Sequence, residues 1–199
     1  MQKSFDRTTL DIAMKSLAIR LSENNAEKIE IVVCGGSALI LTGMVPRTTK
    51  DVDIVALIRT GHLVSPAPLP DELIQAASEV AEDLAIDSNW LNNGPSSGEG
   101  GLFQMGLPQG FADRLTSEVY GECLRVHFID RLDQIHFKLY ASVDRGGYHI
   151  EDLRALTPTP EELESACRWC MTHDVSEGFR MVLSNLLKEL GYEDVAKRL

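Results

Sequence analysis

The chain has 199 residues, of which 44% are hydrophobic and 25% charged, and its formal net charge is −11. This composition is typical of a globular protein, and the length suits one domain with an appendage. The negative charge argues against an extended nucleic-acid surface, because phosphate contacts require an excess of Lys and Arg. With no apolar run near the roughly twenty residues that span a bilayer, and no secretory signal, we expect a cytoplasmic protein without membrane contact.

The first half of the chain alternates between helical and strand-like segments. Apolar residues at helical spacing predict an amphipathic helix over residues 5–22. The continuous apolar runs 28–34 and 51–58 predict buried strands, with a short helix over 37–43 between them. A second amphipathic stripe predicts a helix over 71–84.

The second half begins with a segment of different character. Residues 89–110 are rich in Gly, Asn and Ser, which predicts a mobile loop that cannot pack into a core; a lid over a ligand and a solvated excursion are both open. We expect Trp90 to end a core strand rather than to stack on a base. Residues 115–119 and 123–129 predict a hairpin that adds to the sheet. Further helices are predicted at 130–144, around 152–155, from a capping box at Thr159–Glu162, and at 176–190.

One turn and one pair of carboxylates stand out. Gly35 and Gly36 follow the first strand and let the backbone approach a ligand closely. Amide groups at the start of the next helix would face an anion such as a triphosphate. Asp51 and Asp53 project to one face of the second strand, where a cation such as Mg²⁺ or Mn²⁺ would offset their repulsion. An anion cradle beside a metal site predicts phosphoryl or nucleotidyl transfer.

The spacing of these residues resembles that of a known superfamily. A Gly-Ser turn, about a dozen residues and then Asp-x-Asp on a strand is the signature of DNA polymerase beta-type nucleotidyltransferases. Here Gly36-Ser37 is followed by thirteen residues and then by Asp51 and Asp53. The string Arg47-Thr48-Thr49-Lys50-Asp51-Val52-Asp53 is similar to the Arg-x-Thr-x-Asp-hydrophobic-Asp of the bacterial AbiEii/MenT-like nucleotidyltransferases, which act as toxins or are of unassigned function.

The resemblance covers roughly residues 28–156 and implies a fold. This is an α+β fold in which helices flank a small mixed or antiparallel sheet of the nucleotidyltransferase type, with a C-terminal helical cap. We expect a nucleotidyltransferase-like domain over 1–156 and a helical extension over 157–199. A later segment, from Lys138 to Asp152-Leu153, agrees with the same family.

The resemblance also implies roles for individual residues. Asp51 and Asp53 would bind Mg²⁺, Lys138 would neutralise triphosphate charge, and Asp152 would be a further catalytic or structuring carboxylate. The nucleotide would be bound by Gly35, Gly36, Ser37, Arg47 and Thr49. Such folds often carry a third metal-binding carboxylate on a later strand; Glu122 and Asp130 are the candidates, and the sequence assigns neither.

These expectations define a function and an alternative. The first is a metal-dependent nucleotidyltransferase that moves an NMP from an NTP to a hydroxyl of a protein, a small molecule or an RNA, related to toxin–antitoxin pairs. The second is a catalytically degenerate module of the same fold that binds a nucleotide or a protein. A homodimer and an antitoxin partner are both open, and the sequence does not identify the acceptor.

The cysteines and two arginines are given structural roles. Cys167-x-x-Cys170 with His173 lacks a second pair of zinc ligands at matching spacing, so we expect a reduced and partly buried pair. Arg125 and Arg131 are expected to be solvated surface charges.

Overall fold

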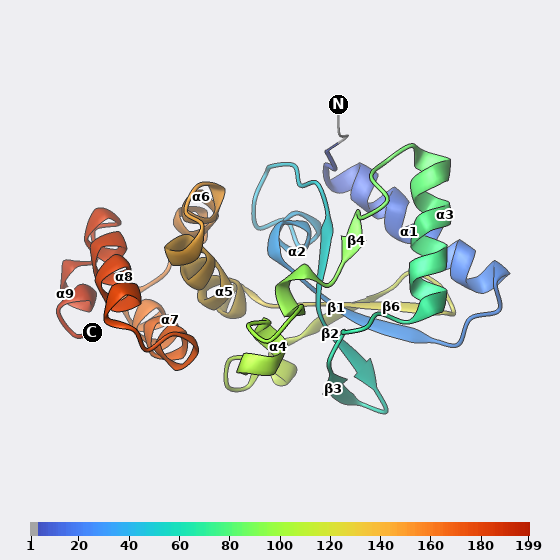
Figure 1. Cartoon of the computed structure of the whole chain (residues 1–199). Helices are drawn as coiled ribbons and strands as arrows, with labels where there is room; N and C mark the ends of the chain where they lie inside the picture. Colours follow the sequence, from blue (N-terminus) through green and yellow to red (C-terminus); the bar gives the residue numbers. More distant parts are fainter. Residues whose placement is uncertain (1–3) are drawn as a thin grey trace. The chain divides into compact units, whose positions relative to one another are not determined.

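The computed structural model describes residues 4–199 and has an α+β fold. Within these residues, six strands form one mixed sheet and helices make up most of the remainder (Figure 1). The chain divides into two compact units, Met1–Ile129 and Asp130–Leu199, which we call unit 1 and unit 2. The predicted α+β class, with a mixed sheet, flanking helices and helices at the C-terminal side, is confirmed.

Unit 1 contains the sheet. Its strands are β1 (Ile29–Cys34), β2 (Val52–Arg59), β3 (His62–Val64), β4 (Leu91–Asn92), β5 (Thr116–Val119) and β6 (Leu124–Phe128). The order is β3-β2-β1-β6-β5, and β4 pairs with β2. β1 runs antiparallel to β2 and parallel to β6. The predicted hairpin is confirmed as the antiparallel pair β5–β6.

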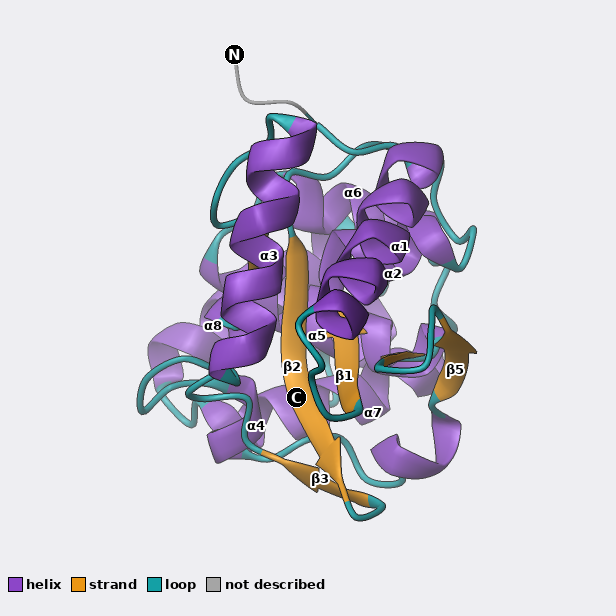
Figure 2. Ribbon diagram, turned by 90° about the vertical axis from the view of Figure 1, so that its right-hand side faces the viewer, coloured by secondary structure: helices purple, strands orange, loops and turns teal. Residues whose placement is uncertain are grey.

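The helices of unit 1 are α1 (Arg7–Glu23), α2 (Gly35–Leu41), α3 (Asp71–Leu84) and α4 (Leu102–Met105), with 3₁₀ turns η1 (Gly94–Ser96) and η2 (Phe111–Arg114). α1 and α3 lie side by side against the same face of β1 and β2 (Figure 2). α1 buries Leu10, Leu17 and Leu21 fully, at the spacing that the sequence predicts. Each such side chain stabilises the fold by about 1.5–3 kcal/mol relative to leaving it exposed.

Part of the segment 89–110 packs against the core, so the prediction that none of it can is wrong. Trp90 is fully buried, as expected of a core residue, and its indole N–H donates to the Ala77 carbonyl oxygen at 2.9 Å. Ser96 is also fully buried, and its hydroxyl donates to the Val55 carbonyl oxygen at 2.7 Å. The composition of this segment correctly indicates a polar turn. It does not reveal that the Ser96 hydroxyl anchors the turn to β2.

Val55 is an extra residue in β2. Along β1, Val32 pairs with Ala56 and Val33 pairs with Ile54, so Val55 falls outside the register. The extra residue of a β-bulge is left out of the ladder, and a buried carbonyl that loses a strand partner needs another donor. The Ser96 hydroxyl is that donor.

Unit 2 is helical throughout its described length. It contains α5 (Arg131–Asp144), α6 (Tyr148–Ala155), α7 (Pro160–His173), α8 (Glu177–Glu189) and α9 (Glu193–Ala196). The predicted capping box is confirmed: Thr159 caps α7, and the Glu162 side chain accepts from the Thr159 amide at 2.8 Å.

The compact units end at a different point from the predicted domains 1–156 and 157–199. α5 packs against α6 and α7, which places residues 130–156 with the C-terminal helices. A unit defined by packing need not coincide with a domain defined by family resemblance, so the latter boundary stays a prediction.

Arg131 is not a solvated charge, and that expectation is wrong. Its guanidinium donates to the Leu156 carbonyl oxygen at 2.7 and 3.0 Å, to Thr157 at 2.9 Å, and to the Glu162 carboxylate at 2.6 Å. It therefore satisfies carbonyls at the end of α6 and fixes the start of α7. The pKa of the Glu162 carboxyl is lowered, and the hydrogen bond from Arg131 is the main cause.

Arg125 also differs from expectation. It is only partly exposed, and its Nε atom is buried without a hydrogen-bond partner among the described residues.

The cysteine pair is confirmed as free and buried. Cys167 and Cys170 lie on α7, and burial raises the pKa of Cys167 to about 12. Over residues 4–199, no group of three or more His, Cys, Asp and Glu side chains could hold a metal ion.

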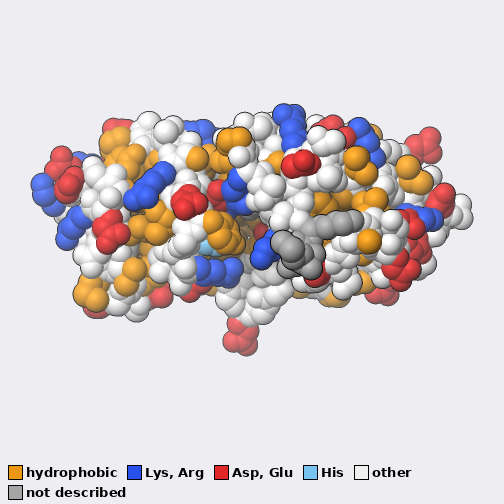
Figure 3. Space-filling model, turned by 90° about the horizontal axis from the view of Figure 1, so that it is seen from above, with side chains coloured by type: hydrophobic (Ala, Val, Ile, Leu, Met, Phe, Trp, Pro, Cys, Tyr) orange, Lys and Arg blue, Asp and Glu red, His pale blue; other side chains and the backbone are white. Residues whose placement is uncertain are grey.

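Surface charge is mixed on the face shown in Figure 3. Lys and Arg side chains lie among Asp and Glu, and hydrophobic side chains form small groups between them. Among the residues that the structure describes, none of the helices combines the length and apolar character needed to cross a membrane.

Ser96→Ala tests the anchor of the 89–110 segment. Removing the hydroxyl leaves the buried Val55 carbonyl without this donor, so we expect the free energy of unfolding to fall by about 1–2 kcal/mol. Ser97→Ala is the matched control; its side chain is exposed, and its loss should change stability by less than about 0.5 kcal/mol. Urea unfolding measures both, and equal effects would contradict the anchoring role.

Glu162→Gln tests the contact with Arg131 and its pH dependence. The amide keeps an acceptor for the Thr159 amide but removes the charge that Arg131 contacts. Because the folded pKa lies below the ordinary value of 4.5, the contribution is present above that value and is lost as pH falls through the folded pKa.

We therefore expect wild type to exceed the variant in stability by about 1 kcal/mol at neutral pH and by nothing once Glu162 is protonated. Urea unfolding across this pH range measures the difference. Glu189→Gln, an exposed change on α8, should leave stability unchanged at each pH. A difference that persists in acid would show that packing, not charge, is responsible.

Candidate active site

The turn after β1 has no room for side chains. Gly35 has φ of 68°, a left-handed conformation that favours glycine, and a Cβ added there would lie 2.8 Å from the Asp53 carboxylate. A Cβ added to Gly36 would lie 2.7 Å from the Arg47 guanidinium and 2.9 Å from the Thr49 hydroxyl. The two glycines therefore bring the backbone against three of the side chains that the sequence singled out.

Strand pairing sets the position of the carboxylates. Asp53 lies opposite Cys34 in the antiparallel β1–β2 ladder, so it sits beside the turn that Gly35 begins. Asp51 directly precedes β2. Both aspartates are partly exposed, whereas Val52 between them is fully buried. This is the alternation of a strand, and it places the two carboxylates on the more open side.

The loop before β2 is held at several points. Phe5 and Thr49 exchange two backbone hydrogen bonds of 2.7 and 2.9 Å. The Thr49 hydroxyl lies 3.4 Å from Asp51 Oδ1, and Arg47 donates to the Thr48 carbonyl oxygen at 2.7 Å. These contacts fix Arg47 and Thr49 next to Gly36. The predicted nucleotide-binding and metal-binding residues of unit 1 therefore form one group, which we call the Gly–Asp cluster: Gly35, Gly36, Ser37, Arg47, Thr49, Asp51 and Asp53.

Ser37 has a more internal position than its neighbours. It is fully buried, and its hydroxyl donates to the Cys34 carbonyl oxygen at 3.2 Å. The hydroxyl is thus used to close the turn, which leaves the backbone amides of Gly36 and Ser37 as the groups suited to an anion.

Lys138 and Asp152 form a separate pair in unit 2. Lys138 Nζ on α5 lies 2.7 Å from Asp152 Oδ2 on α6, and the side chains are only 4% and 2% exposed. The ring of Tyr148 lies 5.8 Å from the same ammonium group, within the range of a cation–π contact. The sequence selected both residues of this pair, but nothing in the motif indicated that they bind each other.

Of the two candidates for a third carboxylate, the sheet separates Glu122 from the Gly–Asp cluster. Glu122 precedes β6, whose first residue pairs with Ile29 at the start of β1, whereas Asp53 pairs with Cys34 at its end. Five residues of strand put these positions roughly 16 Å apart. Asp130 belongs to unit 2, where its side chain caps α5 by accepting from the Asp133 amide at 2.8 Å.

The register places a further polar residue beside this cluster. Asn92 on β4 pairs with Asp53 in parallel, so the two side chains leave the sheet on the same side. Sequence reasoning missed Asn92 because it lies in a Gly- and Asn-rich run with no strand signal. Asn92 lies beside Asp53 only because the two-residue strand β4 pairs with β2, which is about 40 residues earlier in the chain.

The donor set suits a hard cation. Mg²⁺ is usually held by one or two carboxylates together with substrate phosphates and water, rather than by a complete protein cage. Asp51 and Asp53 supply two partly exposed carboxylates, and the Asp53 carboxylate lies directly against the backbone of Gly35. The residues present therefore fit this ion.

Comparison with known proteins agrees with this geometry. Residues 7–87 match the family model described as "Nucleotidyltransferase of unknown function (DUF6036)". The match supports a nucleotidyltransferase family. It contains the whole Gly–Asp cluster and ends before Lys138 and Asp152. No curated protein and no solved structure matches the chain.

Gly35→Ala tests the close approach to Asp53. Alanine would have to adopt the left-handed backbone conformation of Gly35, and its Cβ would collide with the Asp53 carboxylate. We therefore expect a loss of about 2–3 kcal/mol in the free energy of unfolding. The matched control is Gly61→Ala, in the turn between β2 and β3. Gly61 has φ of 79° but no atom within 4 Å of an added Cβ, so only the backbone cost of about 1 kcal/mol applies. Equal losses in the two variants would show that Asp53 does not occupy this space.

Proposed function

We propose that this protein is a metal-dependent nucleotidyltransferase. The observation that carries the proposal is the Gly–Asp cluster, in which the Asp53 carboxylate and the Arg47 guanidinium lie against a glycine turn and the partly exposed Asp51 lies close by, in contact with Thr49. The matched family model supports the same class. The combination suits a nucleoside triphosphate, which brings its own negative charge and needs both a cation and amide donors.

Each residue has a proposed role at this site. Asp51 and Asp53 hold Mg²⁺ or Mn²⁺, which when bound offsets the charge of the triphosphate. The amides of Gly36 and Ser37 bind the β- and γ-phosphates, and Arg47 offsets charge on the departing pyrophosphate. Thr49 keeps Asp51 in place through the contact between its hydroxyl and that carboxylate.

The proposed reaction is an in-line displacement. An acceptor hydroxyl oxygen forms a bond to the α-phosphorus, and the bond from that phosphorus to the oxygen bridging to the β-phosphate breaks. The products are a nucleotidylated acceptor and pyrophosphate, and the hydroxyl proton is released to solvent. The protein contributes position and charge compensation rather than covalent chemistry.

Lys138 and Asp152 are proposed to act together. With Asp152 at 2.7 Å, the charge of Lys138 is already compensated. Asp152 is therefore best described as a structuring carboxylate that holds the lysine, and Lys138 would neutralise triphosphate charge only by exchanging this partner for a phosphate. A buried charge that loses its partner is costly, so such an exchange requires the anion to take its place.

The acceptor is proposed by class only. A protein, a small molecule and an RNA all offer a suitable hydroxyl. The net negative charge of the chain weakens its attraction for a polyanion such as RNA, which favours a protein or a small molecule as the acceptor. The similarity of the Arg47–Asp53 string to AbiEii/MenT-like enzymes makes a toxin–antitoxin role, with an antitoxin as partner, the biological setting to test. Homodimerisation is a further arrangement to examine.

A second candidate function follows from a specific observation. Over residues 4–199, Asp51 and Asp53 are not joined by a third acidic or histidine side chain in a metal-binding group. A protein of this fold that binds a nucleotide or a partner without transferring a nucleotide would be built in the same way. Nucleotide binding without turnover would favour this candidate.

Asp51→Asn and Asp53→Asn test the catalytic proposal. Each change keeps the shape of the side chain and removes the charge that a metal requires, so we expect transfer to fall at least about 100-fold while the fold is retained. The assay follows label from α-³²P-labelled NTPs into protein, small-molecule and RNA acceptors, together with pyrophosphate release.

Asp113→Asn in η2 is the control, because Asp113 is exposed and lies outside the Gly–Asp cluster. Isothermal titration with each NTP, in Mg²⁺ and in EDTA, separates binding from turnover. Wild-type activity in both cluster variants would refute the assignment. Absence of NTP binding by the wild type would refute nucleotidyl transfer and would favour a module of the same fold that binds a protein partner.

A further inference from the structure

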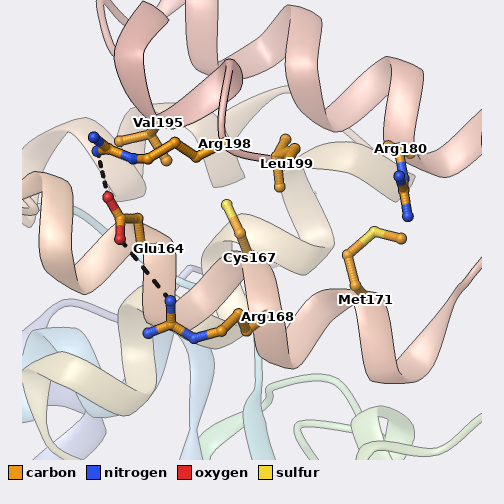
Figure 4. Close-up of a pocket in the computed structure, with 8 residues that line it drawn as sticks. All are labelled: Glu164, Cys167, Arg168, Met171, Arg180, Val195, Arg198 and Leu199. Carbon is orange, nitrogen blue, oxygen red and sulfur yellow. Dashed lines mark ion pairs between the residues drawn. The ribbon is translucent and has the colours of Figure 1, made fainter.

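Unit 2 contains a pocket that the proposed transfer does not use. Its volume is about 290 Å³, and it lies between α7, α8, α9 and the residues that follow α9 (Figure 4). None of its lining residues belongs to the Gly–Asp cluster or to the Lys138–Asp152 pair. The pocket is formed entirely within unit 2, so its shape depends on the packing of these helices alone.

The lining carries an excess of positive charge. Three arginines from three different elements meet here: Arg168 from α7, Arg180 from α8 and Arg198 after α9. One carboxylate, Glu164, faces them. The four side chains therefore carry a formal charge of +2, in a chain whose net charge is −11. Such a reversal of sign favours an anionic ligand.

Two of the three arginines form ion pairs within the pocket, and the third does not. Glu164 forms a close ion pair with Arg198 and a second, at 3.9 Å, with Arg168. Figure 4 shows this group at one end of the pocket, with Arg180 beside Met171 at the other end. The guanidinium of Arg180 has no ion pair or side-chain hydrogen bond among residues 4–199. It can therefore offer its donors to a ligand without breaking an existing pair.

The remaining lining is apolar. Cys167 and Val195 are each only 2% exposed, and Met171 and Leu199 complete the walls. The Cys167 sulfur points into the space between the arginine ends (Figure 4). Burial raises the pKa of this thiol to about 12, so near neutral pH it presents a neutral, polarizable surface. An apolar group on the ligand would bury against these four side chains.

The volume limits the size of the ligand. The pocket volume of about 290 Å³ is at the lower end of the range for small-molecule sites, which suits a small organic ligand. The site is distinct from that of the proposed transfer, because the two share no residue.

We propose that this pocket binds a small organic anion with an apolar chain, in which a carboxylate or phosphate headgroup contacts Arg180 and the chain lies against Cys167, Met171 and Val195. A guanidinium binds either headgroup through two parallel N–H···O bonds, so the headgroup is defined by this shared chemistry. The proposal is independent of nucleotidyl transfer, because it uses none of the same residues.

The test is a titration of the intact chain followed by NMR. Sodium hexanoate, hexyl phosphate and hexylammonium share one chain and differ in their headgroup. With methyl groups labelled in Met, Val and Leu, we expect saturable shifts at Met171, Val195 and Leu199 with hexanoate or hexyl phosphate, with a Kd on the order of 1 mM. Hexylammonium should bind at least about tenfold more weakly. The tighter of the two anions identifies the preferred headgroup.

Arg180→Gln supplies the decisive comparison. It should weaken anion binding about tenfold without unfolding the protein, because Arg180 is exposed and its guanidinium contacts no charged partner among the described residues. Lys188→Gln removes the same charge from another exposed position on α8 and should leave Kd unchanged. Equal binding of hexanoate and hexylammonium, an unchanged Kd in Arg180→Gln, or no saturable shift with either anion would each overturn the proposal. None of these results depends on whether the chain transfers nucleotides.

Discussion

The antiparallel register of β1 and β2 is the constraint on which the candidate active site depends. It places Cys34, the last residue of β1, opposite Asp53 near the start of β2. The Gly35–Gly36 turn, which follows β1, therefore lies beside Asp53. A side chain at either glycine would collide with the groups that the register brings there. The sheet is also shifted by one residue at Val55, just beyond Asp53 in β2. Because side chains alternate along a strand, this bulge helps to set the face on which Asp53 lies.

Features formed by residues close together in the sequence could be predicted, whereas contacts between residues far apart in the chain could not. The turn and the carboxylates could be recognised because their chemistry is written in short strings, and the helices because apolar spacing repeats every few residues. The contacts that were missed join positions far apart. Arg131 reaches carbonyls 25 residues later, and Ser96 reaches Val55 across 41 residues. A composition rich in Gly, Asn and Ser cannot reveal such a contact, because the same residues also serve in solvated loops.

The third carboxylate is a different case, since the sequence offered two candidates and the sheet separates one of them from the site. Strand order decided the matter: β6 runs parallel to β1, so the turn before β6 lies at the end of the sheet away from Asp53. Parallel or antiparallel pairing cannot be read from a strand's own residues. The position of a residue at a strand edge is therefore not predictable until its neighbours are known.

Two pairs of charged groups illustrate how burial distinguishes structural from chemical roles. Lys138 and Asp152 have opposite charges and are almost completely buried, so each compensates the other where water cannot. Asp51 and Asp53 have the same charge and remain partly exposed, so water solvates both carboxylates. Burying the two aspartates without a cation would be costly. Partial exposure is therefore the condition under which these like charges can be kept together, and it is also what the proposed binding of a metal and a triphosphate requires.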